Sequence, residues 1–193
     1  MTDQQSCWLK TIADADADET LKAAYDAVRR EDGGVHNLYK AFGSWPAAMI
    51  SADAFYKTHL HGPNPRLDRW YLELIATQVA WLTECAYARA HHQADFERLL
   101  DNPKRAAAII DAMEREVYED ALGPKHAAIL RYTAKLTAMP QAMRQIDMNL
   151  VRKSGASDAE ILEANQVCSA FAYWVRVING LGIQLGGESV GAC

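Results

Sequence analysis

An acid, a thiol and an imidazole occur within twenty consecutive residues of this chain, as Glu73, Cys85 and His92. Glu73 stands between Leu72 and Leu74 in a segment that is apolar on most sides, so we expect its carboxyl group to be at least partly buried. Burial disfavours the charged form of a carboxyl group, and a carboxyl group of this kind suits proton transfer. These residue types therefore predict chemistry that moves a proton to or from a thiol or a substrate.

The spacing around Cys85 predicts a reactive thiol. If Thr83 caps the helix that follows, Cys85 falls in the first turn, where unpaired amide groups and the helix dipole stabilise a thiolate. His92 comes seven residues after Cys85 and four after Ala88, which places all three positions on one helical face. Two turns separate the thiol from the imidazole, so the spacing alone does not establish a contact between them.

Each of these residues also has a purely structural interpretation. An isolated cysteine in an apolar helix is by default a small core residue, and we expect this for Cys168, with a secondary role in resolving a sulfenic acid on Cys85. Glu73 could instead form an ion pair with Arg69 one turn earlier. The apolar neighbours of Glu73 favour a role in a site.

The histidine pair at positions 91 and 92 does not form a metal-binding motif. Adjacent residues point about 100° apart on a helix, and Asp95 is the only carboxylate at the right spacing from His91. We expect His91 to face solvent and His92 to face the site. The sequence therefore predicts neither a metal ion nor a cofactor.

The elements that position these residues are helices. Apolar residues recur at helical spacing, and the β-branched clusters typical of strands are missing. We predict an all-α, single-domain helical bundle over residues 1–193. Glycine, proline and capping residues, among them the capping-box pattern that begins at Ser157, set the expected helices. They run from Asp16 or Asp18 to Gly33 and over 37–42, 46–59, 67–82, 84–100, 103–114, 124–139, 141–153 and 157–180.

Composition excludes several classes of protein. The chain is 50% hydrophobic and 23% charged, as in ordinary globular proteins, and 20 Lys and Arg against 25 Asp and Glu give a net charge of −5, which disfavours nucleic acid as a partner. We find no secretory signal and no apolar run of about 18 residues, which predicts a cytoplasmic protein without a membrane partner. The four cysteines form no CxxC pair, so we expect neither a zinc site nor a dense disulfide framework.

The series Glu73, eleven residues, Cys85, two residues, Ala88, three residues, His92 resembles the active-site signature of the alkyl hydroperoxidase D and carboxymuconolactone decarboxylase superfamily. The resemblance extends over about residues 21–183 and points to the peroxidase-related branch, whose members are all-helical homo-oligomers. Other similar segments are VHNLYKAFG at 35–43, LTAMP at 136–140, and Arg176 with GLG at 180–182.

The resemblance implies a role for each residue of the series. Glu73 and His92 match the residues that relay protons, and Cys85 matches the first cysteine of a reactive CxxC pair. Ala88 occupies the place of the second cysteine, and alanine can neither attack a substrate nor form a disulfide, so the dithiol cycle is absent. Two further departures are His36, where the family usually has proline, and Val175, where it usually has asparagine.

Three functional hypotheses follow. In the first, the Cys85 thiolate attacks a hydroperoxide, His92 and Glu73 shuttle the proton, and an external thiol regenerates the enzyme, as in antioxidant defence. In the second, a decarboxylase- or lyase-like enzyme uses Glu73 and His92 as general acid and base without the thiol, which Ala88 favours. In the third, the chain is a degenerate, non-catalytic member. Under the enzymatic hypotheses we expect a small-molecule substrate and at least a homodimer, with the site near the interface.

Overall fold

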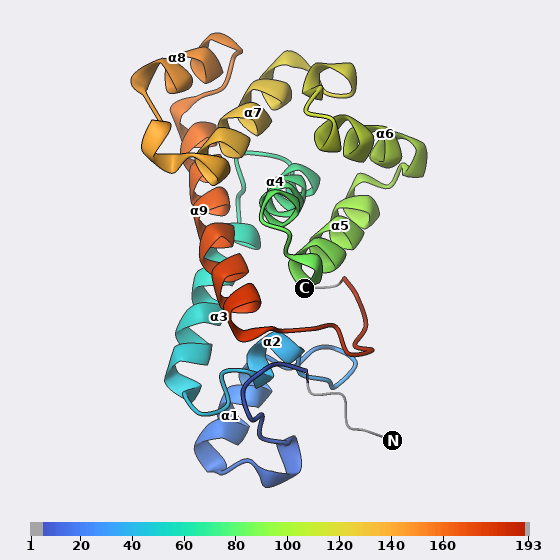
Figure 1. The fold of residues 1–193 in the computed structure, drawn as a ribbon, viewed down its shortest axis with the longest axis vertical. Helices are drawn as coiled ribbons and strands as arrows, with labels where there is room; N and C mark the ends of the chain where they lie inside the picture. The colour runs from blue at the N-terminus through green and yellow to red at the C-terminus, as the bar shows by residue number, and fades with distance from the viewer. Residues whose placement is uncertain (1–5, 192–193) are drawn as a thin grey trace.

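The computed structural model describes residues 6–191, which contain α-helices and short 3-10 turns but no β-strand (Figure 1). The predicted all-α fold is therefore confirmed. No helix among the described residues combines the length and the apolarity that crossing a bilayer requires. The nine helices in this range are α1 (Glu19–Ala27), α2 (Asn37–Lys40), α3 (Pro46–Leu60), α4 (Arg69–Leu82), α5 (Ala86–Leu100), α6 (Pro103–Glu114), α7 (Pro124–Ala138), α8 (Gln145–Lys153) and α9 (Asp158–Leu181).

Helix α4 lies at the centre of the molecule. It packs against α5, α7 and α9, and every residue from Tyr71 to Ala80 is buried (Figure 1). A helix that is apolar nearly all round is stable only when neighbours cover all of its faces. A polar side chain on such a helix must find its partner inside the protein, and this requirement applies to Glu73.

Helices α3 and α9 run side by side along one flank, and α1 and α2 lie at one end of the molecule (Figure 1). After α9 the chain turns back past α2 and reaches α5, so the C-terminal segment closes over residues far earlier in the sequence (Figure 1). Asn37 holds this segment because its Nδ2 donates to the carbonyl oxygens of Gln184 and Leu185, each at 3.0 Å.

The junction between α4 and α5 differs from the prediction. Thr83 ends α4, its Oγ1 donating to the Val79 carbonyl oxygen at 2.7 Å, and does not cap α5. Glu84 then adopts a left-handed conformation with φ of 53°, and Cys85 itself is the N-cap residue of α5. The predicted cap was therefore wrong by two residues, because a threonine hydroxyl bonds as readily to a preceding carbonyl oxygen as to a following amide.

Three other boundaries also moved. The first helix, predicted to reach Gly33, ends at Ala27. The segment predicted as one helix over 141–153 begins with a 3-10 turn at Pro140–Ala142, and α8 starts only at Gln145. The carboxylate of Asp147 accepts from the backbone N–H of Arg144 at 2.8 Å, which fixes this later start. The expected turn over 37–42 ends as an α-helix at Lys40.

Candidate active site

Glu73 of α4 and His92 of α5 form a buried hydrogen-bonded pair. Glu73 Oε2 lies 2.8 Å from His92 Nδ1, and the two residues are 1% and 6% exposed. The alternative pairing of Glu73 with Arg69 was wrong, since the Arg69 guanidinium donates to the carbonyl oxygen of Gly62. A carboxylate that accepts from Nδ1–H orients the ring and leaves the lone pair on Nε2, as a general base requires.

Cys85 is the N-cap residue of α5, and its thiol is buried. Its side chain is 1% exposed, and burial raises the pKa of the thiol, although the backbone N–H of Ala88 offsets part of this effect. Burial thus acts against the expected thiolate, and the reactivity of Cys85 stays a prediction. The backbone N–H at the helix start does stabilise the thiolate, which lowers the pKa. The cost of burying the charged thiolate away from water is larger, so the net effect is a raised pKa.

A pocket of about 160 Å³ lies beside the Glu73–His92 pair. Ala88 and His92 contribute to its wall from α5, and Phe171 and Trp174 contribute from α9, while Cys85 is not among its lining residues. The edge of the His92 ring meets Phe171 with 4.5 Å between ring centroids. The imidazole of His92 therefore packs against aromatic side chains at the pocket wall. The neighbouring lining residue on α5 is Ala88, which has no thiol.

Charged side chains from α3 and from the loop after α1 also line this pocket. Lys57 Nζ lies 2.8 Å from Asp53 Oδ2, and Asp53 Oδ1 accepts from the hydroxyl of Tyr39 at 2.8 Å. Arg30 is paired with Asp32 at 2.7 Å. The sequence did not single out these residues, because each ion pair uses common surface residues and the pocket forms only when distant segments meet.

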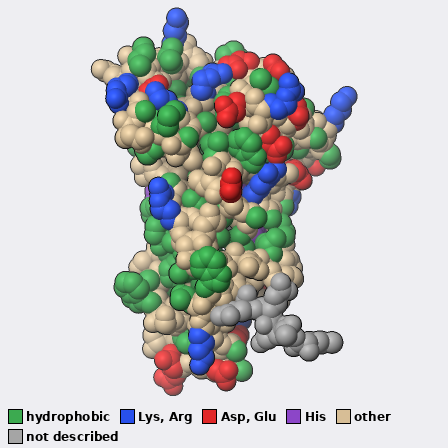
Figure 2. Space-filling view, in the orientation of Figure 1, with side chains coloured by type: hydrophobic (Ala, Val, Ile, Leu, Met, Phe, Trp, Pro, Cys, Tyr) green, Lys and Arg blue, Asp and Glu red, His purple; other side chains and the backbone are tan. Residues whose placement is uncertain are grey.

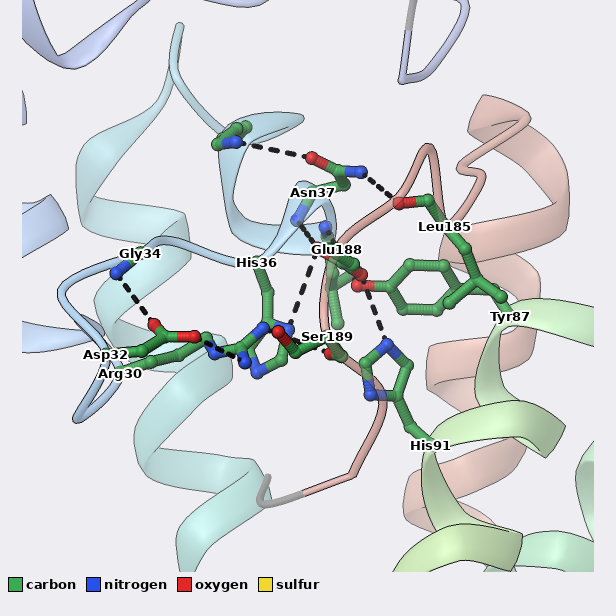
Figure 3. Close-up of polar contacts among 12 residues, drawn as sticks. Arg30, Asp32, Gly34, His36, Asn37, Tyr87, His91, Leu185, Glu188 and Ser189 are labelled. Carbon is green, nitrogen blue, oxygen red and sulfur yellow. Dashed lines mark hydrogen bonds and ion pairs between the residues drawn. The ribbon is translucent and has the colours of Figure 1, made fainter.

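A second polar cluster adjoins the pocket and connects α5 to the C-terminal segment (Figure 3). His91 is 1% exposed, and its Nε2 lies 3.1 Å from Glu188 Oε1, so the expectation of a solvent-facing His91 was wrong. Burial lowers the pKa of His91. Burial alone would raise the pKa of Glu188, but the neighbouring imidazoles of His36 and His91 hold it well below its ordinary value. Nothing in the sequence indicated Glu188, which is 97 residues away from His91.

The remaining described cysteines are structural. Cys168 is buried on α9, its sulfur lies 3.3 Å from Thr137 Oγ1 of α7, and burial raises the pKa of its thiol. Cys7 is also buried, and both are free thiols. The predicted core role of Cys168 agrees with this placement. Cys193 lies outside the described residues.

Comparison with known proteins shows the fold. The chain matches the core of alkylhydroperoxidase AhpD in an uncharacterized peroxidase-related protein from Ralstonia eutropha JMP134, with a TM-score of 0.80 and 16% identity over 95% of this chain and 94% of that one. The chain has an AhpD-like fold. An uncharacterized peroxidase-related protein from Silicibacter sp. TM1040 matches with a TM-score of 0.79 and 21% identity over 97% of this chain and 98% of the other. No family model and no curated protein matches the sequence.

Within this AhpD-like fold, the sequence resemblance and the geometry coincide at α4 and α5. The two helices bring the carboxylate of Glu73 and the ring of His92 into contact and place Cys85 one residue before α5. Ala88 lies at the pocket wall, in the position that the resemblance assigns to a second cysteine. The pocket wall at this point therefore offers an acid–base pair and an alanine methyl group.

Proposed function

We propose that this protein is a peroxidase-related oxidoreductase that reduces a small hydroperoxide with the single thiol of Cys85. The observation that carries the proposal is the buried 2.8 Å pair of Glu73 and His92, which places a base of defined tautomer on a pocket in an AhpD-like fold. A pocket of about 160 Å³ suits a small-molecule substrate rather than a polymer.

The proposed reaction begins when His92 takes the proton of the Cys85 thiol, with Glu73 stabilising the imidazolium. The sulfur attacks the terminal, hydrogen-bearing oxygen of the hydroperoxide, an S–O bond forms, the O–O bond breaks, and His92 returns the proton to the departing alkoxide. The products are an alcohol and a sulfenic acid. One external thiol then forms a mixed disulfide and releases water, and a second thiol frees Cys85 as an external disulfide leaves.

A second candidate is general acid–base catalysis without the thiol, as in a decarboxylase or lyase. The burial of Cys85, the raised pKa of its thiol and the presence of Ala88 at the pocket wall favour it. A pairing of Glu73 with Arg69 alone would have pointed to the non-catalytic hypothesis, and Glu73 bonds to His92 instead.

The two catalytic candidates differ in what happens when the thiol is removed. We would measure consumption of cumene hydroperoxide and hydrogen peroxide with dithiothreitol as reductant, in wild type, Cys85→Ala, Glu73→Gln and the control Cys168→Ala. Thiol chemistry predicts a loss of about 100-fold or more in both site variants, in line with the usual contribution of general acid–base catalysis, and full activity in the control. Peroxide consumption that survives in Cys85→Ala, or a wild type that consumes neither peroxide, overturns the first candidate, and an inactive wild type leaves the thiol-free candidate.

We further propose that the protein is a homo-oligomer. Large apolar side chains on α3 and α9 are exposed, and hydrophobic side chains gather over these two helices on the face in Figure 2. Trp45 is 69% exposed beside a groove lined by Phe55 and Tyr173. Exposed apolar surface of this kind marks interaction sites. Sedimentation should show at least a dimer in wild type and a shift toward monomer in Trp45→Glu, whereas a monomeric wild type would contradict this proposal.

A further inference from the structure

Three side chains with metal-binding atoms converge from three distant segments beside the pocket (Figure 3). His36 comes from the residue before α2, His91 from α5, and Glu188 from the segment after α9. One ligand atom from each lies within 4.8 Å of the other two, and this is the only such group among the described residues.

We propose that His36, His91 and Glu188 bind one divalent transition-metal ion of the zinc type. His91 cannot share a metal ion with the adjacent His92, because the two side chains diverge on the helix. His36 and Glu188 instead come from distant segments that the fold brings beside His91. Two imidazoles and one carboxylate are a common ligand set for zinc and for other first-row divalent ions, and they leave coordination positions open.

The two separations between an imidazole and the Glu188 carboxylate are close to those of a tetrahedral ion. With metal–ligand bonds of about 2.0–2.2 Å, neighbouring ligand atoms of a tetrahedral site lie about 3.3–3.5 Å apart. His91 Nε2 lies 3.1 Å from Glu188 Oε1, and His36 Nδ1 lies 3.7 Å from Glu188 Oε2. Both measured pairs are within a few tenths of an ångström of the required separation.

His36 supplies the observation that points most directly to a ligand. Its Nδ1 is buried and has no hydrogen-bond partner. Buried polar atoms are nearly always satisfied, so an unsatisfied one requires an explanation. A metal ion between this nitrogen and the Glu188 carboxylate would satisfy it.

The structure also shows what the metal must displace. Gly191 N–H donates to His91 Nδ1 at 3.2 Å, so the ring carries its proton on Nε2 and donates it to Glu188. A metal on Nε2 moves that proton to Nδ1, which can no longer accept from Gly191. Metal binding should therefore release the Gly191 amide, and this gives the site a signature of its own.

The surroundings favour a transition metal over calcium or magnesium. The latter ions prefer oxygen ligands, and this site offers two ring nitrogens and a single carboxylate. Glu188 Oε2 also accepts from the backbone N–H of Asn37 at 2.7 Å, which orients the carboxylate as outer partners do in metal sites. His36 and His91 both line the pocket, so an open coordination position there would be available to water or to a small ligand.

The test removes metal from the protein with EDTA, adds Zn²⁺ back in excess and dialyses away the unbound ion. We expect one tightly bound Zn²⁺ per chain by elemental analysis, and a tetrahedral visible spectrum when Co²⁺ replaces it. His36→Ala and Glu188→Gln should each weaken Zn²⁺ binding by at least about tenfold, measured by competition with a chromophoric chelator. His59→Ala removes a half-buried histidine of α3 outside the cluster and should bind as wild type does.

Hydrogen exchange supplies the second readout, because Zn²⁺ should accelerate exchange at the Gly191 amide in wild type and not in His36→Ala. Circular dichroism tests whether each variant is folded. If Glu188→Gln does not fold, the Zn²⁺ affinity of His36→Ala and the Co²⁺ spectrum of wild type test the metal site. A wild type that retains no stoichiometric Zn²⁺, or equal affinity in wild type and His36→Ala, overturns the proposal. Since neither Glu73 nor Cys85 is involved, this outcome is independent of the peroxidase assay.

Discussion

The side chain at position 88 determines which chemical group α5 presents to the pocket next to His92. Ala88 lines the pocket together with His92, whereas Cys85 is buried one turn earlier. The sequence predicted that Glu73 and His92 belong to one site, because an apolar helix leaves a lone carboxylate in need of a partner. It could not predict the pKa of the Cys85 thiol, because a position at a helix start lowers this pKa and burial raises it. The relative size of the two effects depends on the fold.

The raised pKa of Cys85 predicts how its reactivity depends on pH. The thiolate is the reactive form, and below the thiol pKa its fraction rises about tenfold for each pH unit. Because burial places that pKa above its ordinary value of 9.0, alkylation by iodoacetamide should accelerate throughout pH 7–9 without reaching a plateau. Peptide mass spectrometry would follow Cys85 separately from the other cysteines, and a plateau below pH 8 would show an activated thiolate instead.

At the scale of elements, the helices were largely predictable and their junctions were not. The periodicity of α4 and α9 identified both helices, and the Ser157 capping box placed the start of α9 correctly. The start of α5 was misplaced because the chain passes through a left-handed Glu84, and no residue type there signals it. The pairing of His91 with Glu188 was also beyond the sequence, since it depends on the path of the segment that follows α9.

The cap of α9 gives a stability prediction. The side chain of Ser157 accepts from the backbone N–H of Glu160, and Glu160 in turn accepts from the backbone N–H of Ser157. Ser157→Ala should lower the free energy of unfolding by about 1 kcal/mol, as loss of an N-cap usually does. Ser51→Ala, an exposed serine within α3, should be neutral or slightly stabilising in the same urea titration. Equal stabilities for Ser157→Ala and wild type would show that the cap contributes nothing.

At the scale of the whole molecule, the N-terminal segment closes against the end of α9. Trp8 N–H donates to the carbonyl oxygen of Leu181 at 2.8 Å, and Gln184 N–H donates to that of Ser6 at 2.9 Å. Gly182 ends α9 with φ of 60°, and a Cβ there would lie 2.2 Å from the Trp8 ring. The start of the described chain is therefore hydrogen-bonded to the residues on either side of Gly182, from which the C-terminal segment continues toward Glu188.

Two glycines near this junction should respond in opposite ways to alanine. Gly182→Ala should cost about 1–2 kcal/mol of unfolding free energy for the left-handed conformation alone, and more because the methyl group displaces Trp8. Gly180→Ala places a methyl group in open space within α9 and should be neutral or stabilise by up to about 1 kcal/mol. Urea unfolding of the two variants checks this, and equal stabilities would contradict the described packing of Trp8.

The central claim is that one buried thiol, served by the Glu73–His92 pair, reduces a hydroperoxide. The most direct measurement is the mass of the Cys85 peptide after one equivalent of hydroperoxide, with dimedone to trap sulfenic acid. The account predicts a dimedone adduct on Cys85 in wild type, formed much more slowly in Glu73→Gln. An unmodified Cys85 in the folded wild-type protein would contradict it.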